Sequence, residues 1–388
     1  SAMLSIGECF FNGKGVSQDK TKAFEWYLKS ADNGNAAAMI KVGECYDKGK
    51  GVTQDFTKAF EWYLKLADNG NVDAMIKVGE CYFNGQGTSK DEGRAFEWYL
   101  KSAEKGNTDA QNKVAIMHLK AAENGDVSAM LSIGECFFNG KGVSQDKTKA
   151  FEWYLKSANN GFAVAMNKVG VCYDKGQGVT QDFAKAFEWY QRAANGGNAD
   201  AMCSVGDFYF KGFCVTQDFT KAFELYLKAA NNGNTCAMNK VGLCYSKGFG
   251  VAQDMTKGFE WYLKAANHGD HDAMFNAGVC YAKGFGVTQD LTQAFEWFLK
   301  AANNGNALAM NKIGECYSKG DGICVNHAKA FEWFEKAAKR NDPHGVHNLG
   351  LCYHEGAGVE KDTVKAEQLF QKAKEFGWTD QSSECLVQ

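Results

Sequence analysis

The sequence has a single proline and no run of about 18 consecutive apolar residues, the length that a helix needs to span a membrane. With so little proline, helix ends have to be marked mainly by glycine, of which there are 43. Hydrophobic residues make up 45% of the chain and charged residues 23%, which excludes a long disordered segment. The composition is typical of a folded protein with many glycine-ended helices.

An excess of charge of one sign is also missing. The 43 basic and 46 acidic residues give a net charge of -3, and both signs are interspersed throughout the chain. A protein that follows a phosphate backbone needs a basic stripe, so this charge pattern disfavours nucleic-acid binding. The chain begins with Ser1 rather than methionine, so the lack of a signal peptide says little about localisation.

A length of 388 residues exceeds what one compact core supports, and an internal repeat accounts for it. The pair Ala-Met marks most units, and nine of the ten steps between unit starts are 36 residues long. The starts are Ala2, Ala38, Ala74, Ala110, Ala129, Ala165, Ala201, Ala237, Ala273, Ala309 and Gly345. Such a period is typical of a solenoid, in which each unit buries its apolar face by stacking on its neighbours.

Residues 71–106 illustrate the predicted structure of one unit. Asn71 is a suitable N-cap for a first helix that ends at Gly85, and Asp91 for a second helix that ends at Gly106. The side chains expected on the buried arcs are Ala74, Met75, Val78, Gly79, Cys81 and Tyr82 in the first helix, and Ala95, Phe96, Trp98, Tyr99, Leu100 and Ala103 in the second. Each unit is therefore predicted to be an all-α helix-turn-helix.

This pattern resembles the Sel-1-like repeat family, which is related to the tetratricopeptide repeats. In the unit that starts at Ala237, the resemblance is carried by Val-Gly-x-x-Tyr-x-x-Gly-x-Gly-Val from Val241 to Val251 and by Trp-x-x-Lys-Ala-Ala from Trp261. The resemblance implies a right-handed α/α superhelix, or solenoid, whose first helices line a concave face. It also implies use as a scaffold or adaptor for protein complexes and signalling.

One unit is irregular. Residues 1–31 are identical to residues 128–158, which indicates a duplication and makes Ser1 native sequence. The fourth unit runs from Ala110 to the next start after only 19 residues, and 110–123 is predicted to be one helix. A lone helix reverses the alternation of helix direction, so we expect a kink between two arcs. The predicted segments are 1–109 with three repeats, 110–128 as the junction, and 129–388 with seven repeats; a distortion within one continuous solenoid is the alternative.

The two ends of the array differ. In the last unit, Glu367 stands where other units have Phe, and Lys374 where they have Ala, which predicts a C-terminal cap. The N-terminal unit lacks such changes. Either further repeats precede it, or its apolar edge makes an end-to-end contact with a partner.

Fourteen cysteines suggest disulfides or metal sites, but their positions argue against both. Nine share one core position, and stacked units place equivalent residues about 10 Å apart, beyond the reach of a disulfide. They are Cys9, Cys45, Cys81, Cys136, Cys172, Cys244, Cys280, Cys316 and Cys352. The other five, Cys203, Cys214, Cys236, Cys324 and Cys385, lack metal-ligand spacing and are interpreted as incidental thiols. Because the cysteines do not pair, a cytoplasmic location is favoured, with a removed signal peptide left open.

No catalytic, metal or cofactor site is predicted. The histidines of the last first helix, His344, His347 and His354, are expected on its exposed face. His268 and His271 are expected with Asp270 and Asp272 in a solvated turn. The Gly-x-Gly turns lack the Lys-Ser/Thr ending of a phosphate loop, and no Ser/His/Asp or Cys/His set recurs. The chain is therefore not expected to be an enzyme.

A stripe of variable residues is the candidate binding surface. Counting the first alanine of each unit as position one, positions three, seven and ten lie opposite the core arc. At position three, every second unit carries an asparagine followed by a lysine, beginning at Asn167. The amide would clamp an extended peptide backbone, and the lysine would attract acidic side chains. The predicted partner-binding residues are Asn167, Lys168, Val171, Phe210, Asn239, Lys240, Leu243, Phe275, Val279, Asn311, Lys312 and Glu315.

Two alternatives stay open for this stripe: its polar residues are solvated filler, or its apolar residues pack between units. The leading functional hypothesis is a scaffold that binds a protein or an extended peptide on the concave face. A weak β-lactam hydrolase is an alternative suggested by the cysteine-rich relatives, whose cysteine pairs are missing here. Structural self-assembly through the N-terminal edge is the third.

Overall fold

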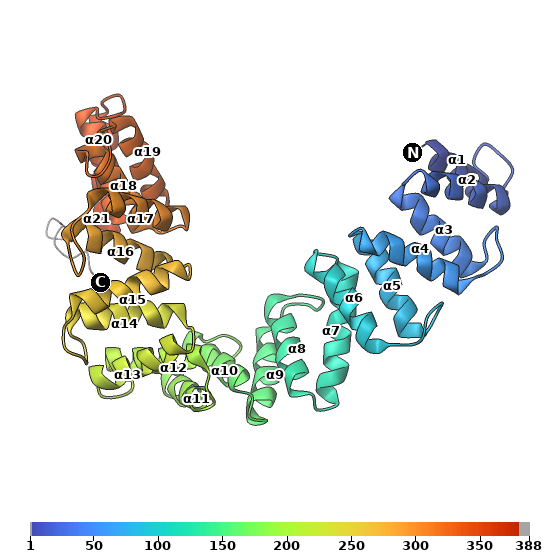
Figure 1. Cartoon of the computed structure of the whole chain (residues 1–388), viewed down its shortest axis with the longest axis horizontal. Coiled ribbons are helices and arrows are strands. Elements are labelled where there is room, and N and C mark those ends of the chain that lie inside the picture. The colour runs from blue at the N-terminus through green and yellow to red at the C-terminus, as the bar shows by residue number, and fades with distance from the viewer. Residues whose placement is uncertain (1, 380–388) are drawn as a thin grey trace. The chain divides into compact units, whose positions relative to one another are not determined.

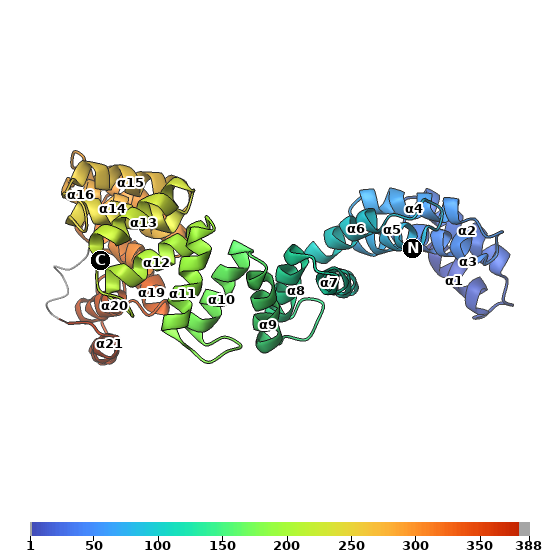
Figure 2. The ribbon, with the colours of Figure 1, turned by 90° about the horizontal axis from the view of Figure 1, so that it is seen from below.

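A computed structural model of the chain describes residues 2–379, which form 21 α-helices and no strand. Helices that follow each other in sequence lie side by side in pairs (Figures 1 and 2). The first helices of the ten full units are α1 (Ala2–Asn12), α3 (Ala36–Lys48), α5 (Val72–Asn84), α8 (Val127–Asn139), α10 (Ala163–Lys175), α12 (Ala199–Lys211), α14 (Thr235–Lys247), α16 (His271–Lys283), α18 (Ala307–Lys319) and α20 (Pro343–Glu355). The second helices are α2 (Lys20–Asp32), α4 (Phe56–Asp68), α6 (Glu92–Glu104), α9 (Lys147–Asn159), α11 (Phe183–Asn195), α13 (Phe219–Asn231), α15 (Met255–Asn267), α17 (Leu291–Asn303), α19 (His327–Lys339) and α21 (Thr363–Glu375). The predicted all-α solenoid of helix-turn-helix units is confirmed.

Side-chain caps fix where these helices begin. The carboxamide oxygen of Asn71 accepts a hydrogen bond of 2.9 Å from the backbone N–H of Ala74, and Asp91 accepts one of 2.9 Å from Arg94. Gly85 ends α5 with a φ of 71°, a left-handed conformation that glycine adopts without strain. The predicted caps are thus confirmed. The same arrangement recurs along the array, although Phe162, which precedes α10, supplies no capping side chain.

A helical glycine sets the distance between the two helices of each unit. A Cβ added to Gly79 would lie 2.5 Å from Cε1 of Tyr99, so the ring packs directly on the backbone of α5. This contact explains why glycine and an aromatic residue recur at these positions. One expected core residue is wrong: Leu100 is 37% exposed, whereas Ser102 is buried and donates its hydroxyl to the carbonyl of Val72 at 2.9 Å.

A second glycine joins most repeats to the one before them. Gly286 has a φ of +71°, and a Cβ added to it would lie 2.1 Å from the carbonyl oxygen of Met255, the first residue of α15. The turn of one repeat therefore rests on the first turn of the preceding second helix. Glycine allows this approach of two backbones without strain.

Helix α7 (Thr108–Glu123) is the single helix predicted for the truncated unit. It acts as a first helix toward α5, because Lys113 forms a 3.1 Å ion pair with Glu80. It also acts as a second helix toward α8, because Gly142 of the following turn rests on the carbonyl of Gln111. Val114 packs in the apolar cluster of the preceding repeats, and Ala115 in that of the following ones. The junction is therefore a boundary between two cores, and the kink between two arcs stays a prediction.

The chain divides into two compact units, residues 1–182 and 183–388, and the junction at α7 lies inside the first. The segments 1–109, 110–128 and 129–388 follow the repeat register and stay a prediction. In α21, Glu367 and Lys374 are both exposed, as expected for a capping helix. No helix among residues 2–379 combines the length and the apolar character needed to cross a bilayer.

Candidate functional site: a row of pockets along the first helices

Pockets recur between successive first helices. In the second compact unit, residues 183–388, a pocket of about 180 Å³ lies between α14 and α16 and another of about 180 Å³ between α16 and α18. A third, of about 590 Å³, lies between α18 and α20. We call these three the groove pockets. In the first compact unit, residues 1–182, a pocket of about 290 Å³ lies between α1 and α3. It is lined mainly by charged residues, among them Glu8, Lys41 and Glu44.

The groove pockets are built from equivalent residues of successive repeats. Positions ten and eleven of one first helix form one wall, and positions four, seven and eight of the next form the other. An aromatic ring from the second helix between them supplies a third side. Position ten is Ser246, Ala282 and Ser318, position eleven is Lys247, Lys283 and Lys319, and the rings are Tyr262, Phe298 and Phe334. One pocket therefore opens at each of three consecutive repeat steps.

The residue at position ten differs between the repeats that form these pockets. In α12 this position is Phe210, whose ring centroid lies 5.1 Å from that of Phe219 and 5.3 Å from that of Phe249. The phenyl group of Phe210 thus packs against the rings of Phe219 and Phe249. The next three repeats carry serine or alanine at the same position, so no phenyl group lies on that side of the groove pockets. The pocket between α1 and α3 is open with Phe11 at position ten, so a small residue there is not the sole cause of the opening.

Charged residues along the first helices mostly form ion pairs with one another. Lys312 lies 2.8 Å from Glu315 in the same helix, and Lys113 and Lys77 both pair with Glu80, at 3.1 and 2.9 Å. Burial opposes the charge of Glu80, but the two lysines outweigh it and lower the pKa of this carboxyl. Charges at positions four and seven are therefore largely neutralised within the array.

The lysines at position eleven are different. Lys247, Lys283 and Lys319 are exposed at the C-terminal ends of their helices, and none of them forms an ion pair within residues 2–379. Asp321 and Glu355 line the second and third groove pockets, whereas no acidic residue lines the first. The α14–α16 end of the row is therefore the more attractive to acidic groups.

The position-three residues of the predicted stripe do not face solvent as expected. Asn311 is 2% exposed, Phe275 5% and Asn167 9%. The amide of Asn311 donates to Glu315 at 2.9 Å and accepts from Asn348 of the next repeat at 2.8 Å. The physical reason is that a first helix in a stack has a neighbour on each side, so position three packs against the adjacent repeat. The expected exposure is wrong for these residues, and a clamp on a partner stays a prediction.

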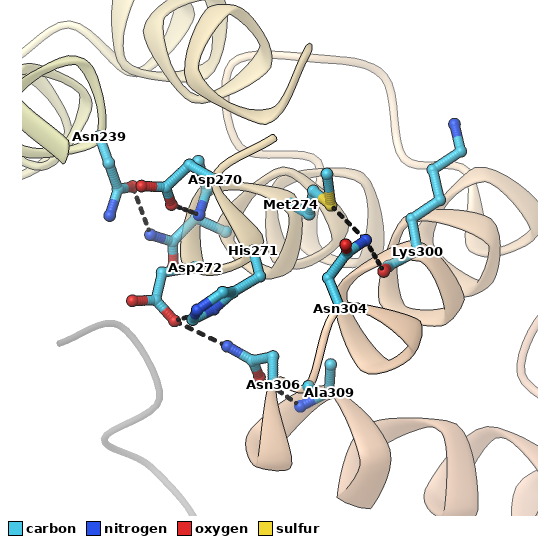
Figure 3. A network of polar contacts seen from close by, with 12 residues as sticks. Asn239, Asp270, His271, Asp272, Met274, Lys300, Asn304, Asn306 and Ala309 are labelled. Carbon is cyan, nitrogen blue, oxygen red and sulfur yellow. Dashed lines mark hydrogen bonds and ion pairs between the residues drawn. The ribbon is translucent and has the colours of Figure 1, made fainter. Parts of the chain in front are cut away.

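The other predicted residues divide between pairing, packing and the pockets. Lys168 pairs with Glu135 at 2.7 Å, Lys240 pairs with Asp207, and Asn239 accepts from Asn276 at 3.0 Å (Figure 3). Val171, Phe210 and Leu243 are half-buried. Val279, Lys312 and Glu315 line groove pockets, although Val279 is only 5% exposed. Sequence reasoning missed position eleven, although a lysine recurs there in Lys247, Lys283 and Lys319.

Removing the amide of Asn311 should destabilise the second unit. Asn311→Ala deletes a buried donor and acceptor, removes the acceptor of the Asn348 amide and leaves Glu315 with Lys312 alone, which costs about 1 to 3 kcal/mol. Urea unfolding of the full chain measures this. Asn239→Ala, at a half-buried position with one such bond, is the matched control and should cost less. Equal losses in the free energy of unfolding for the two variants would show that burial of the Asn311 bonds adds nothing to stability.

The acidic and histidine residues near 268–272 serve as helix caps (Figure 3). Asp270 accepts from Ala273 N–H at 2.7 Å, and burial raises the pKa of this carboxyl. Asp272 accepts from Asn306 of the next repeat at 2.8 Å and contacts His271 at 3.0 Å. His268, His271 and Asp272 are exposed, as expected for a solvated turn, whereas Asp270 is half-buried as the N-cap of α16. The bond from Asn306 to Asp272 also joins this turn to the next repeat. No group of three or more His, Cys, Asp or Glu within residues 2–379 is placed to hold a metal ion.

The histidines of α20 and the nine cysteines that share one core position, here called the column cysteines, differ in their burial. His354 is exposed as expected, but His347 is not, because its ring stacks on Trp378 with centroids 3.7 Å apart and lines the third groove pocket. Most column cysteines are buried free thiols, and burial raises the pKa of Cys280 to about 12. Cys9 is exposed, and Cys385 lies outside the described residues.

Ten segments of the chain match the model of a known repeat. The model of the Sel1 repeat matches residues 1–35, 36–71, 72–107, 127–162, 163–198, 199–234, 237–270, 271–306, 307–342 and 343–375. The ten matches confirm the ten full repeats, and residues 108–126 of the truncated unit fall between them. No curated protein matches the chain.

Two solved structures share the fold. A protective antigen of uropathogenic Escherichia coli, c5321, which displays an SLR fold, is 30% identical with a TM-score of 0.64, over 96% of this chain and 84% of that one. A Sel1 repeat protein from Oxalobacter formigenes is 26% identical with a TM-score of 0.55, over 89% of this chain and 91% of that one. The similarity to both extends over most of the repeat array.

Proposed function

Because this chain belongs to the Sel1 repeat family, we propose that it is a scaffold or adaptor whose second unit binds an extended segment of a partner protein in the groove pockets. Protein binding is the general role of such repeat folds, and the pockets supply a specific surface for it. The observation that carries the proposal is the recurrence of one open pocket at equivalent residues of three consecutive repeats.

The spacing of the pockets restricts the conformation of the partner. With the spacing typical of packed helices, successive groove pockets are expected about 10 Å apart. A polyproline II segment advances about 3.1 Å per residue with three residues per turn, so every third side chain points the same way about 9 Å further on. A partner with apolar side chains at every third position would place one in each pocket.

The lining residues specify the chemistry of that partner. Met255, Val279 and Phe285 make the first groove pocket mainly apolar, and Leu291 and Phe298 line the second. The exposed Lys247 and Lys283 flank these two pockets. The preferred ligand is therefore an extended segment with apolar side chains every third residue and acidic residues toward its α14–α16 end.

A display library of random dodecapeptides tests this proposal. Selection on the full chain should enrich sequences with apolar residues three apart and with Asp or Glu near one end. The matched selection uses the chain with Lys247→Glu and Lys283→Glu, which should lose the acidic preference and keep the apolar spacing. Enriched peptides without that spacing, or the same acidic preference in both selections, would contradict the proposed mode.

A further inference from the structure

Two cysteines of neighbouring repeats face each other where α12 and α14 pack together. Asn234, the N-cap of α14, donates to Asp200 at 2.7 Å, and one turn further along Lys240 pairs with Asp207. These contacts fix the register of the two helices on either side of residue 236. Cys203 and Cys236 are 33 residues apart, as are Asp207 and Lys240 one turn further on, so in this register the two cysteines face each other across the two helices. Each thiol shifts the pKa of the other.

The two thiols have different surroundings. Cys203 is buried, with 6% of its surface exposed, and its pKa is raised by the hydrogen bond to Cys236 and by burial. Cys236 is exposed in the first turn of α14, where backbone N–H groups favour an anion. The hydrogen bond from Cys203, and next the charge of Lys240, lower the pKa of Cys236. Cys236 is therefore the more reactive thiol, and Cys203 is the buried thiol next to it.

No other cysteines among residues 2–379 show this arrangement. The column cysteines Cys244, Cys280 and Cys316 are buried and belong to different repeats of one column. Cys214 and Cys324 are exposed and lie in the turns of different repeats. They serve as internal standards for an exposed thiol without a neighbouring partner.

We propose that Cys203 and Cys236 form a reversible dithiol–disulfide pair that is oxidised by low-molecular-weight disulfides such as oxidised glutathione. The Cys236 thiolate attacks one sulfur of the disulfide, forms a mixed disulfide and releases one glutathione thiolate. Cys203 then attacks the Cys236 sulfur, the second glutathione leaves, and it takes the proton of Cys203. The protein loses two electrons and two thiols become one disulfide, while one oxidised glutathione is reduced to two glutathione molecules.

The disulfide would link the first helices of two repeats directly. It would lie beside the Lys240–Asp207 ion pair and one repeat step before the first groove pocket. Since a repeat array is held together only by contacts between neighbours, a covalent link across one interface restricts separation of that interface. Oxidation is therefore expected to slow backbone hydrogen exchange in α12 and α14.

The test is treatment of the full reduced chain with oxidised glutathione at pH 7, followed by proteolysis and mass spectrometry. The wild type should yield a Cys203–Cys236 linked peptide, and Cys236 should be modified at least tenfold faster than Cys214 or Cys324. In Cys203→Ser, a stable glutathione adduct should accumulate on Cys236, because the resolving thiol is gone. In Cys236→Ser, no linked peptide forms and Cys203 stays reduced.

The results that would overturn the proposal are equally specific. They are a persistent glutathione adduct on Cys236 in the wild type, or modification of Cys236 no faster than that of Cys214. Circular dichroism of both serine variants shows whether each stays folded. If Cys203→Ser unfolds, Cys203→Ala gives the same chemical readout, since alanine is common at buried positions of these helices.

Discussion

Replacing Gly286 by alanine should cost the second unit about 3 to 5 kcal/mol, the range seen when a substitution forces backbone strain. Two effects add. A non-glycine residue at a φ of +71° costs about 1 to 2 kcal/mol. The new Cβ would also lie 2.1 Å from the carbonyl oxygen of Met255 and 2.4 Å from its carbonyl carbon, so the turn has to move away from α15. Urea unfolding of the full chain, with hydrogen exchange to locate the loss, measures this.

Two further variants separate these effects. Gly269 also has a positive φ, of +94°, but no atom lies within 4 Å of an added Cβ, so Gly269→Ala should cost only about 1 to 2 kcal/mol. Cys214 occupies the position of Gly250 and Gly286 in its own repeat, with a φ of 58°. Cys214→Gly should therefore stabilise the chain by about 0.5 to 1 kcal/mol. Equal losses at Gly269 and Gly286 would show that the turn does not rest on α15.

Filling a groove pocket should weaken binding of a selected peptide by about 10- to 100-fold, because one buried apolar side chain contributes about 1.5 to 3 kcal/mol. Ala282→Phe places a ring in the second groove pocket. The fold should tolerate it, since other repeats carry phenylalanine at the same position, as in Phe210. Fluorescence anisotropy with a peptide from the display selection measures the affinity.

A matched control separates pocket filling from added hydrophobicity. Glu224→Phe adds the same ring to the exposed face of the second helix α13, away from the groove pockets, and should leave the affinity unchanged. The melting temperature of both variants should stay close to that of the wild type. An Ala282→Phe chain that folds and binds with wild-type affinity would exclude the second groove pocket from the binding site.

The repeat, its caps and its core were predictable because they depend on residues close in sequence. Asn71 and Asp91 cap helices through bonds that span only three residues, so their pattern is visible in one unit. Gly79 was assigned to the buried arc from helical periodicity alone. Leu100 was misplaced because a single helical wheel does not say how wide the contact with the neighbouring repeat is.

The binding surface was harder to predict because it depends on the stacking of repeats. A helical wheel places position three opposite the core, yet Asn311 is buried between α18 and its neighbours. Positions seven, ten and eleven line the open pockets. The cavity beside Ala282 is lined by residues of two first helices and of the second helix between them, which the periodicity of one helix does not register. Likewise, Cys203 and Cys236 are 33 positions apart, and only the register between α12 and α14 brings them together.

Photo-crosslinking tests the central claim most directly. A selected peptide carrying benzoyl-phenylalanine at its central apolar position is irradiated with the full chain, and the attachment site is found by mass spectrometry. Attachment at residues that line the groove pockets, such as Met255, Val279 or Leu291, is the predicted result. Attachment on the exposed faces of the second helices, or in the first unit, would contradict the account.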